Sequence, residues 1–261
     1  MLELNKVTVI FNEGTVNEKI ALSEIDLHLD EGDFVTIIGS NGAGKSTLFQ
    51  AISGAVDIKE GEIILDDENM TYKPEYQRSR VIGRLFQDPL KGTAPSMSIQ
   101  ENLSLASQRG KHFSLNLFPK QDRKGYIDAL KSLNLGLEDR LTSKVNTLSG
   151  GQRQALTLLM ATYVTPKLLL LDEHTAALDP KTAQNVLELT DKLIKEKKIT
   201  ALMITHNMED ALKYGNKTLI MKDGKIVILL QGKQREKMTV EDLISLYSSS
   251  TNEYNDKMIL R

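Results

Sequence analysis

Apolar and polar residues alternate along the first third of the chain with the period of two that is typical of β-strands. This alternation predicts strands at residues 1–11 and 20–29, joined by a polar turn at 12–17. Residues 34–38 (FVTII) instead form a short apolar run, which indicates a strand buried on both faces. Further strands are predicted at 61–66 and 81–86.

Helical patterns begin after the buried strand. A glycine-rich loop follows residue 38, and a helix is predicted from Lys45 to about Ser53. Between residues 88 and 147, a loop punctuated by Pro and Gly precedes predicted helices at 98–106 and 121–133. We interpret this region as an inserted α-helical subdomain, at about residues 88–160.

The chain then returns to an alternation of helices and strands, predicted at 150–163, 168–172, 180–197 and 199–205. Helices of this length connect parallel strands, so the order implies a mostly parallel sheet. A hairpin turned by Asp223 and Gly224 is predicted over 217–230. The predicted fold class is α/β, with a mostly parallel sheet, an N-terminal antiparallel β-subdomain and the inserted helical subdomain.

Composition excludes several classes of function. The 261 residues carry 33 Lys plus Arg and 35 Asp plus Glu, a net charge of -2 that favours neither bulk nucleic acid nor an anionic membrane. The chain has no cysteine, which excludes disulfides and thiolate chemistry. No apolar run approaches the roughly 20 residues of a spanning helix, and residues 1–11 do not resemble a signal peptide. We therefore expect a cytoplasmic protein that meets a membrane only through a partner.

The strongest chemical signal is GSNGAGKS at residues 39–46, which matches G-x-x-x-x-G-K-[ST] between a buried strand and a helix. Glycines let the backbone wrap a phosphate, and the N–H groups of the helix N-terminus face its negative charge. Lys45 directs its charge toward the β- and γ-phosphates, and the Ser46 hydroxyl is a Mg²⁺ ligand. The motif predicts a P-loop NTPase core that binds ATP and Mg²⁺, without distinguishing NTPases from kinases.

A second motif, LSGGQ at residues 148–152, opens an apolar helix and offers another N-terminus that can receive an anion. It resembles the signature of the ABC ATPases, which in that family completes the nucleotide site of the opposite subunit. The resemblance implies that ATP binds between two copies or two paired ATPase subunits. The predicted contacts from this side are Ser149, Gly150, Gly151 and Gln152.

Other residues follow in the order of that family. Residues 168–173 (LLLLDE) resemble the Walker B strand, which implies that Asp172 orients Mg²⁺ and that Glu173 polarises the attacking water as general base. Gln87 matches the Q-loop glutamine, which senses the metal and the γ-phosphate and couples to the helical subdomain. His206 matches the switch histidine, so the implied catalytic group is Glu173, His206 and Gln87.

The remaining nucleotide contacts are also implied by the resemblance. Asp179, in ALD at 177–179, resembles the D-loop, and Phe11 lies where the family has an aromatic residue that stacks on adenine. We interpret His28 and His112 as surface or structural residues. The contacts expected from the phosphate loop itself are Gly39, Ser40, Asn41, Gly42, Ala43, Gly44, Lys45, Ser46 and Thr47.

The resemblance covers residues 1–232, an ABC-type ATP-binding domain, and leaves a polar tail at 233–261 with one helix at 240–247. It implies the ATP-hydrolysing subunit of an ABC transporter, a homodimer or paired subunit on the inner face of the membrane, with a transmembrane permease and a substrate-binding protein as partners and no nucleic acid. His174 replaces the family's usual proline after the Walker B glutamate, and the helix after the signature lacks its usual basic residues. In both departures the sequence resembles the ATPases of bacterial uptake systems that are proposed to carry aromatic amino acids or similar small solutes.

Three alternatives remain open at this point. They are a non-transport ABC ATPase that acts on DNA or ribosomes, the ATPase of an exporter or FtsX-like permease, and a metabolic P-loop kinase. Long heptad insertions, Cys-rich modules or a second ATPase unit would indicate the first, and the sequence contains none of them. A metabolic kinase does not need the motif at 148–152, which argues against the third alternative. The transported substrate is chosen by other chains.

Overall fold

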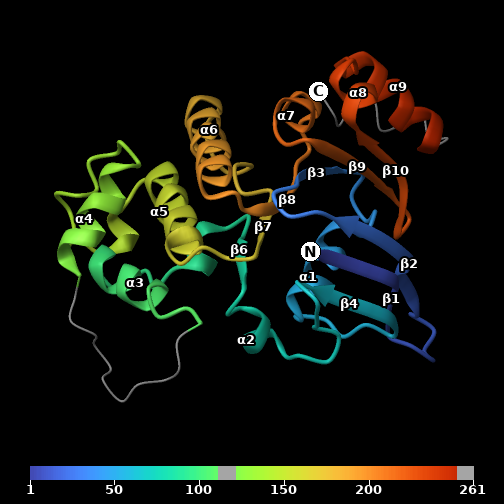
Figure 1. The fold of residues 1–261 in the computed structure, drawn as a ribbon, viewed down its shortest axis with the longest axis horizontal. Helices are drawn as coiled ribbons and strands as arrows, with labels where there is room; N and C mark the ends of the chain where they lie inside the picture. Colours follow the sequence, from blue (N-terminus) through green and yellow to red (C-terminus); the bar gives the residue numbers. More distant parts are fainter. Residues whose placement is uncertain (111–121, 252–261) are drawn as a thin grey trace. The chain divides into compact units, whose positions relative to one another are not determined.

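The computed structural model describes residues 1–110 and 122–251, which form two compact units (Figure 1). Unit 1 combines residues 1–78 with the chain from 198 onward, and unit 2 comprises Ser79–Lys197. His112 and the first residue of the helix predicted at 121–133 lie outside the described residues.

Unit 1 begins with an antiparallel sheet of order β2-β1-β4-β5. The long strands β1 (Leu2–Phe11) and β2 (Lys19–Leu29) pair from Leu2 opposite Leu29 to Phe11 opposite Lys19. The strands β4 (Glu60–Leu65) and β5 (Glu68–Asn69) extend the other edge. This sheet confirms the predicted N-terminal antiparallel β-subdomain.

A second sheet in unit 1 runs in the order β10-β9-β3-β8. The buried strand β3 (Phe34–Ile38) is parallel to both β8 (Thr200–Ile204) and β9 (Lys217–Lys222). The strand β10 (Lys225–Gln231) pairs with β9 as the predicted antiparallel hairpin. Asp223 and Gly224 turn it with φ of 47° and 74°, the left-handed conformation that a tight hairpin requires.

Helices cover this second sheet. The helix α1 (Lys45–Ser53) has its last carbonyls held by the buried Arg78 guanidinium, which donates to Ala51 and Ile52. Arg78 ends the short helix α2 (Glu75–Arg78). Further along, α7 (Met208–Lys213) and α9 (Val240–Thr251) pack on a buried cluster that includes Ile38 and Tyr247, and α8 (Gly232–Glu236) precedes α9.

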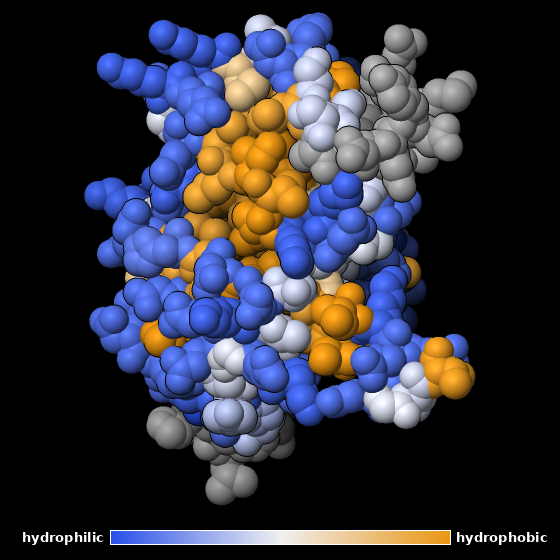
Figure 2. All heavy atoms as spheres, turned by 90° about the vertical axis from the view of Figure 1, so that its right-hand side faces the viewer, coloured by the Kyte–Doolittle hydropathy of each residue, from blue (hydrophilic) through white to orange (hydrophobic). Residues whose placement is uncertain are grey.

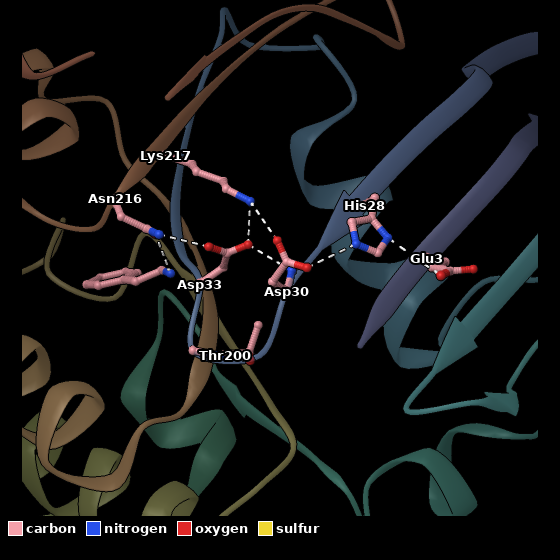
Figure 3. A network of polar contacts seen from close by, with 9 residues as sticks. Glu3, His28, Asp30, Asp33, Thr200, Asn216 and Lys217 are labelled. Atoms are coloured by element: carbon pink, nitrogen blue, oxygen red, sulfur yellow. Dashed lines mark hydrogen bonds and ion pairs between the residues drawn. The ribbon is translucent and has the colours of Figure 1, made fainter. Parts of the chain in front are cut away.

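A polar network fixes the end of unit 1 at which β3 begins (Figure 3). The buried Asp33 carboxylate accepts hydrogen bonds from Lys217 Nζ, from Asn216 Nδ2 at 2.8 Å and from the Asp30 backbone N–H at 2.8 Å. Burial alone would raise the pKa of Asp33, but the bonds from Lys217 and Asn216 outweigh it and hold that pKa below its usual value. His28 lies at the exposed end of this network, between Asp30 and Glu3, as the sequence predicts for a surface residue.

The strand β10 exposes apolar side chains. Val227 and Leu229 are 40% and 36% exposed, and Figure 2 shows an apolar strip on the face that β10 helps to form. Next to this strand is an open groove of about 550 Å³, lined on its polar side by residues such as Asp26 and Lys217.

Unit 2 is built around two parallel strands and a group of helices. β6 (Ile82–Leu85) pairs with β7 (Leu168–Asp172), whose first four residues are buried. The helices are α3 (Ile99–Ala106), α4 (Arg123–Lys131), α5 (Gly150–Tyr163) and α6 (Pro180–Lys197), with short 3₁₀ turns at Pro89–Gly92 and Val145–Thr147. Their shared core contains Leu103, Tyr126, Leu130 and Leu156.

The predicted strands and long helices are confirmed within about two residues at each end. The helix predicted at 240–247 in the tail is also present, but it continues to Thr251. The short elements α2, β5, α7 and α8 were not predicted. Their lengths of two to six residues leave too little sequence for a periodic pattern. The bounds of 88–160 for the helical subdomain stay a prediction.

Candidate functional site

The loop between β3 and α1 has the backbone that a phosphate cradle needs. Gly42 and Gly44 have φ of 85° and 99°, a backbone conformation that residues with a side chain rarely adopt. A Cβ on Gly39 would lie 2.5 Å from the carbonyl oxygen of Met221, and one on Gly44 would lie 2.8 Å from that of Ala21. Close backbone approaches therefore require glycine at positions 39 and 44, and the backbone conformation favours glycine at 42 and 44.

The start of α1 is arranged to receive an anion. Gly44 occupies its N-cap without a side-chain hydrogen bond, and the first turn carries no acidic residue. Its N–H groups thus offer the partial positive charge of a helix N-terminus. Lys45, only 5% exposed, donates from Nζ to the carbonyls of Gly39 and Ser40, which holds the ammonium over the loop, whereas Ser46 is exposed.

The β9–β10 hairpin supports the phosphate loop, a role that sequence reasoning missed. Gly224 donates its N–H to the Ala43 carbonyl at 3.0 Å and accepts from the Ser23 N–H at 2.9 Å. One glycine thus joins the loop to β2. The dipeptide Asp223–Gly224 predicts a hairpin, but only the tertiary fold shows what its turn contacts.

His206 and Phe11 also belong to unit 1. The Thr205 N–H donates to Ile37 at 3.1 Å, so His206 emerges beside the carboxyl end of β3, at the same edge as the phosphate loop. Phe11 pairs with Lys19 on β2. Ala21, whose carbonyl comes close to Gly44, lies two residues further along β2, or about 7 Å from Lys19. The structure therefore brings Gly39–Thr47, His206 and the strand end of Phe11 to one part of unit 1.

In unit 2, the carboxyl ends of β6 and β7 carry Gln87, Asp172 and Glu173. Leu85 pairs with Leu171 in parallel register, so Gln87 and Glu173 both lie two residues beyond a paired position. Asp172 Oδ2 is 3.8 Å from Arg84 Nη2, and the Arg84 guanidinium lies 4.6 Å above the Phe86 ring. Gln87 is exposed, whereas the Asp172 side chain is 16% exposed. Arg84 was not predicted as part of the site.

The residues that follow β7 form a tight turn into α6. Glu173 has φ of +45°, and its carbonyl accepts from the Ala176 N–H at 3.0 Å. His174 is buried, and burial lowers its pKa to about 4, so its ring is neutral near pH 7. The Asp179 carboxylate accepts from the Thr182 N–H at 3.1 Å and thereby caps α6. Hydrogen bonds from Thr182 keep the Asp179 pKa below its usual value.

The LSGGQ motif forms the exposed N-terminus of α5. Leu148 is buried in the helical core, and the next residue, Ser149, caps the helix. The Ser149 Oγ accepts from Gln152 N at 3.3 Å, and Gln152 Oε1 accepts from Ser149 N at 3.2 Å, a capping box. Gly150 and Gly151 face the start of the turn into α6, because a Cβ at these positions would meet Leu178 and Thr182.

Backbone hydrogen bonds connect the segment after Gln87 with the segment before LSGGQ. Val145 N–H donates to Met97 and Asn146 N–H donates to Pro95, both at 3.0 Å. The side chain of Asn102 is fully buried and bonds both the N–H and the carbonyl of Ala94. Sequence reasoning missed this connection, because its partners lie about 50 residues apart and neither segment has a regular pattern.

The chemistry of the donors fits Mg²⁺ on a phosphate. The residues predicted to hold Mg²⁺ are Ser46, Gln87 and Asp172, and each has a side-chain oxygen of the kind that hard divalent cations prefer. Among the described residues, no group of three or more His, Cys, Asp or Glu side chains could hold a metal ion. A single carboxylate with a hydroxyl and an amide is typical of Mg²⁺ that is bound largely through nucleotide phosphates.

Comparison with known proteins decides among the families that share a P-loop. The model of the family described as "ABC transporter" matches residues 22–176. The chain belongs to the ABC transporter family. It is an ATP-binding, ATP-hydrolysing cassette that works with Mg²⁺ and whose family pairs two ATPase subunits with a transmembrane permease.

Two relatives and one solved structure show the extent of the similarity. The chain is 42% identical over 247 residues to a tyrosine transport ATP-binding protein of Clostridioides difficile, covering 95% of this chain and 98% of that one. It is 32% identical over 234 residues to the phosphonates import ATP-binding protein PhnC of Lactobacillus johnsonii, covering 87% of this chain and 89% of that one. The dimeric post-hydrolysis cassette MJ0796, bound to ADP and Pi, superimposes with a TM-score of 0.75 at 29% identity, covering 88% and 98% of the two chains.

These similarities confirm the predicted fold class, the ATPase activity and the family resemblance. Across the described residues of this ABC cassette, no helix is long and apolar enough to span a membrane.

Proposed function

We propose that this ABC cassette drives the uptake of a small, amino-acid-like solute, with an aromatic amino acid such as tyrosine as the first candidate. The observation that carries the proposal is the 42% identity to a tyrosine transport ATP-binding protein over nearly the full length of both chains. The phosphonate relative supports import as the direction. An exporter, a DNA-directed or ribosome-directed ATPase and a kinase have no such support among these relatives.

ATP is held by the phosphate loop in this proposal. Backbone N–H groups at the start of α1 bind the phosphates, and the Lys45 ammonium neutralises charge on the β- and γ-phosphates. When bound, Mg²⁺ neutralises further phosphate charge, with Ser46, Gln87 and Asp172 as its protein-side oxygens. Phe11 stacks on adenine, since the aromatic ring lies on the strand end closest to the loop.

Hydrolysis requires one water aligned with the γ-phosphate. Glu173 accepts the proton of this water, and His206 donates a hydrogen bond to the γ-phosphate, which stabilises the charge that moves onto the leaving oxygens. Gln87 reports the presence of the metal and γ-phosphate to the helical part of unit 2, through the backbone connections that follow it. Arg84 orients the Asp172 carboxylate from 3.8 Å away.

The LSGGQ motif acts on the ATP of a second subunit. The N-terminus of α5 approaches the γ-phosphate held by the partner's loop, with Ser149 and Gly150 exposed and Gly151 and Gln152 directly behind them. Asp179 lies at the same interface. Two ATP molecules then hold two subunits together, and hydrolysis releases them. The solved dimeric cassette with ADP and Pi supports this arrangement.

The energy of this cycle reaches the solute through other chains. The permease attaches the cassette to the inner face of the membrane and contacts the helical part of unit 2. A substrate-binding protein delivers the solute on the other side. The cassette itself selects no solute in this proposal.

The test is ATP-dependent transport by the assembled complex. The cassette should co-purify with a hydrophobic permease. In proteoliposomes containing both and the binding protein, radiolabelled tyrosine should accumulate when ATP is present. Lys45→Ala is the control, because it should lose ATP affinity and uptake while leaving the assembly intact. Turnover stimulated by DNA or ribosomes, or uptake that continues in Lys45→Ala, would overturn the proposal.

A further inference from the structure

The backbone of Glu173 adopts a conformation that needs support. Its φ of +45° lies in the left-handed region, where a Cβ comes too close to the following carbonyl oxygen. Residues in this region persist where the surrounding structure holds them. The same φ decides the direction in which the Glu173 side chain leaves the end of β7.

The next residue, His174, is anchored to the middle of α6. Its ring is 2% exposed, and its Nε2 lies 3.2 Å from the Oγ1 of Thr190, which is 1% exposed. The Thr190 hydroxyl already donates its one hydrogen to the Val186 carbonyl at 2.7 Å. The His174 Nε2 must therefore carry the hydrogen and donate it to Thr190.

The two ends of this turn are fixed by different bonds. Glu173 accepts from Ala176, and Asp179 caps the first turn of α6 through Thr182. The contact between His174 and Thr190 is a side-chain anchor between the turn and the body of α6. Thr190 lies ten residues into that helix, so the anchor ties the turn to a rigid element.

We propose that His174 is a positioning residue whose hydrogen bond to Thr190 holds Glu173 in its left-handed conformation and so aims the Glu173 carboxylate. The proposal rests on the role of Glu173 as general base given above. It makes Thr190, which is buried within α6, a determinant of the rate of hydrolysis.

Thr190→Val and Thr190→Ser form a matched pair. Valine keeps the shape of threonine but removes the acceptor, whereas serine keeps the hydroxyl. In single-turnover hydrolysis with Mg²⁺-ATP, Thr190→Val should lower the rate constant about tenfold or more, since small misplacements of a catalytic group cost factors of this size. Its Kd for Mg²⁺-ATP, measured with a fluorescent ATP analogue, should change less than about threefold. Thr190→Ser should keep wild-type values.

His174 provides a second pair. His174→Gln places an amide N–H near the position of Nε2 and should retain most of the rate. His174→Leu should lose it, because leucine fills a similar volume but has no N–H to donate to Thr190. If Thr190→Val fails to fold, the His174 pair decides the proposal by itself.

Glu173→Gln separates this proposal from the role on which it rests. In a Glu173→Gln background, Thr190→Val should cause no further loss of rate, because the group that it misplaces no longer acts. Wild-type turnover in Glu173→Gln would overturn the general-base role. Loss of turnover in Glu173→Gln together with equal rates for Thr190→Val and Thr190→Ser would overturn only the positioning proposal. A lower melting temperature of Thr190→Val with an unchanged rate constant would also overturn it.

Discussion

Gly151 is the position in the LSGGQ motif where the structure predicts the largest effect of a single methyl group. An alanine Cβ at 151 would lie 2.1 Å from the Thr182 Cγ2, whereas carbon atoms in contact need about 3.5–4.0 Å. Every other heavy atom near that Cβ is at 3.6 Å or beyond. The whole conflict is therefore with one methyl group at the start of α6.

Gly151→Ala requires a shift of about 1.5 Å, either of the Thr182 methyl group or between the starts of α5 and α6, and overpacking of this kind costs about 1–3 kcal/mol. Because the chain has no tryptophan, unfolding in urea is best followed by circular dichroism. Thr182→Ser removes the opposing methyl group, so the double variant Gly151→Ala/Thr182→Ser should recover most of the lost free energy of unfolding. The double variant should also form the ATP-dependent dimer more readily than Gly151→Ala alone.

Two outcomes would refute this reasoning. One is Gly151→Ala with wild-type stability, which would mean that the Thr182 methyl group or the two helix starts move without cost. The other is a double variant no more stable than Gly151→Ala, which would place the conflict elsewhere. A Gly150→Ala comparison is expected to be milder, since its Cβ would approach only Leu178, at 3.2 Å.

Further predictions concern unit 1. Gly224→Ala should weaken Mg²⁺-ATP binding about tenfold, because its Cβ would lie 2.7 Å from the Ala21 carbonyl and displace the N–H that holds Ala43. Gly232→Ala is the control, as it shares a positive φ but would contact nothing, and equal losses in the two variants would contradict a specific role. Asp33→Asn should cost about 1–3 kcal/mol near pH 7, since the Lys217 ammonium loses its nearest carboxylate. The folded pKa of Asp33 is lowered, so its contribution is present above the unfolded value of 3.8 and is lost as pH falls below it. Urea unfolding from pH 7 to 3.5 checks this, and a difference that already shrinks between pH 6 and 5 would contradict it.

The sequence predicted elements that have a periodic pattern and site residues that belong to a motif. The run at 34–38 and the glycine-rich loop after it are local signals, and each is confirmed in position. Asn207, followed by Glu209 and Asp210, is also a helix-start signal, so the unpredicted α7 could have been found.

The contacts that position the site could not have been predicted, because their partners are distant in the chain. Nothing local indicates that Gly224 bonds Ala43, that Val145 bonds Met97, or that His174 reaches Thr190. The left-handed backbone of Glu173 is equally hidden, since glutamate rarely adopts it.

The central claim is that ATP is hydrolysed between two copies of the cassette, with the phosphate loop of one facing the LSGGQ motif of the other. Sedimentation of Glu173→Gln with saturating Mg²⁺-ATP tests it most directly. A stable dimer with two ATP molecules is predicted, which Ser149→Arg in the same background should prevent without loss of ATP binding. A Glu173→Gln protein that remains monomeric with ATP bound, or a dimer indifferent to Ser149→Arg, would contradict the claim.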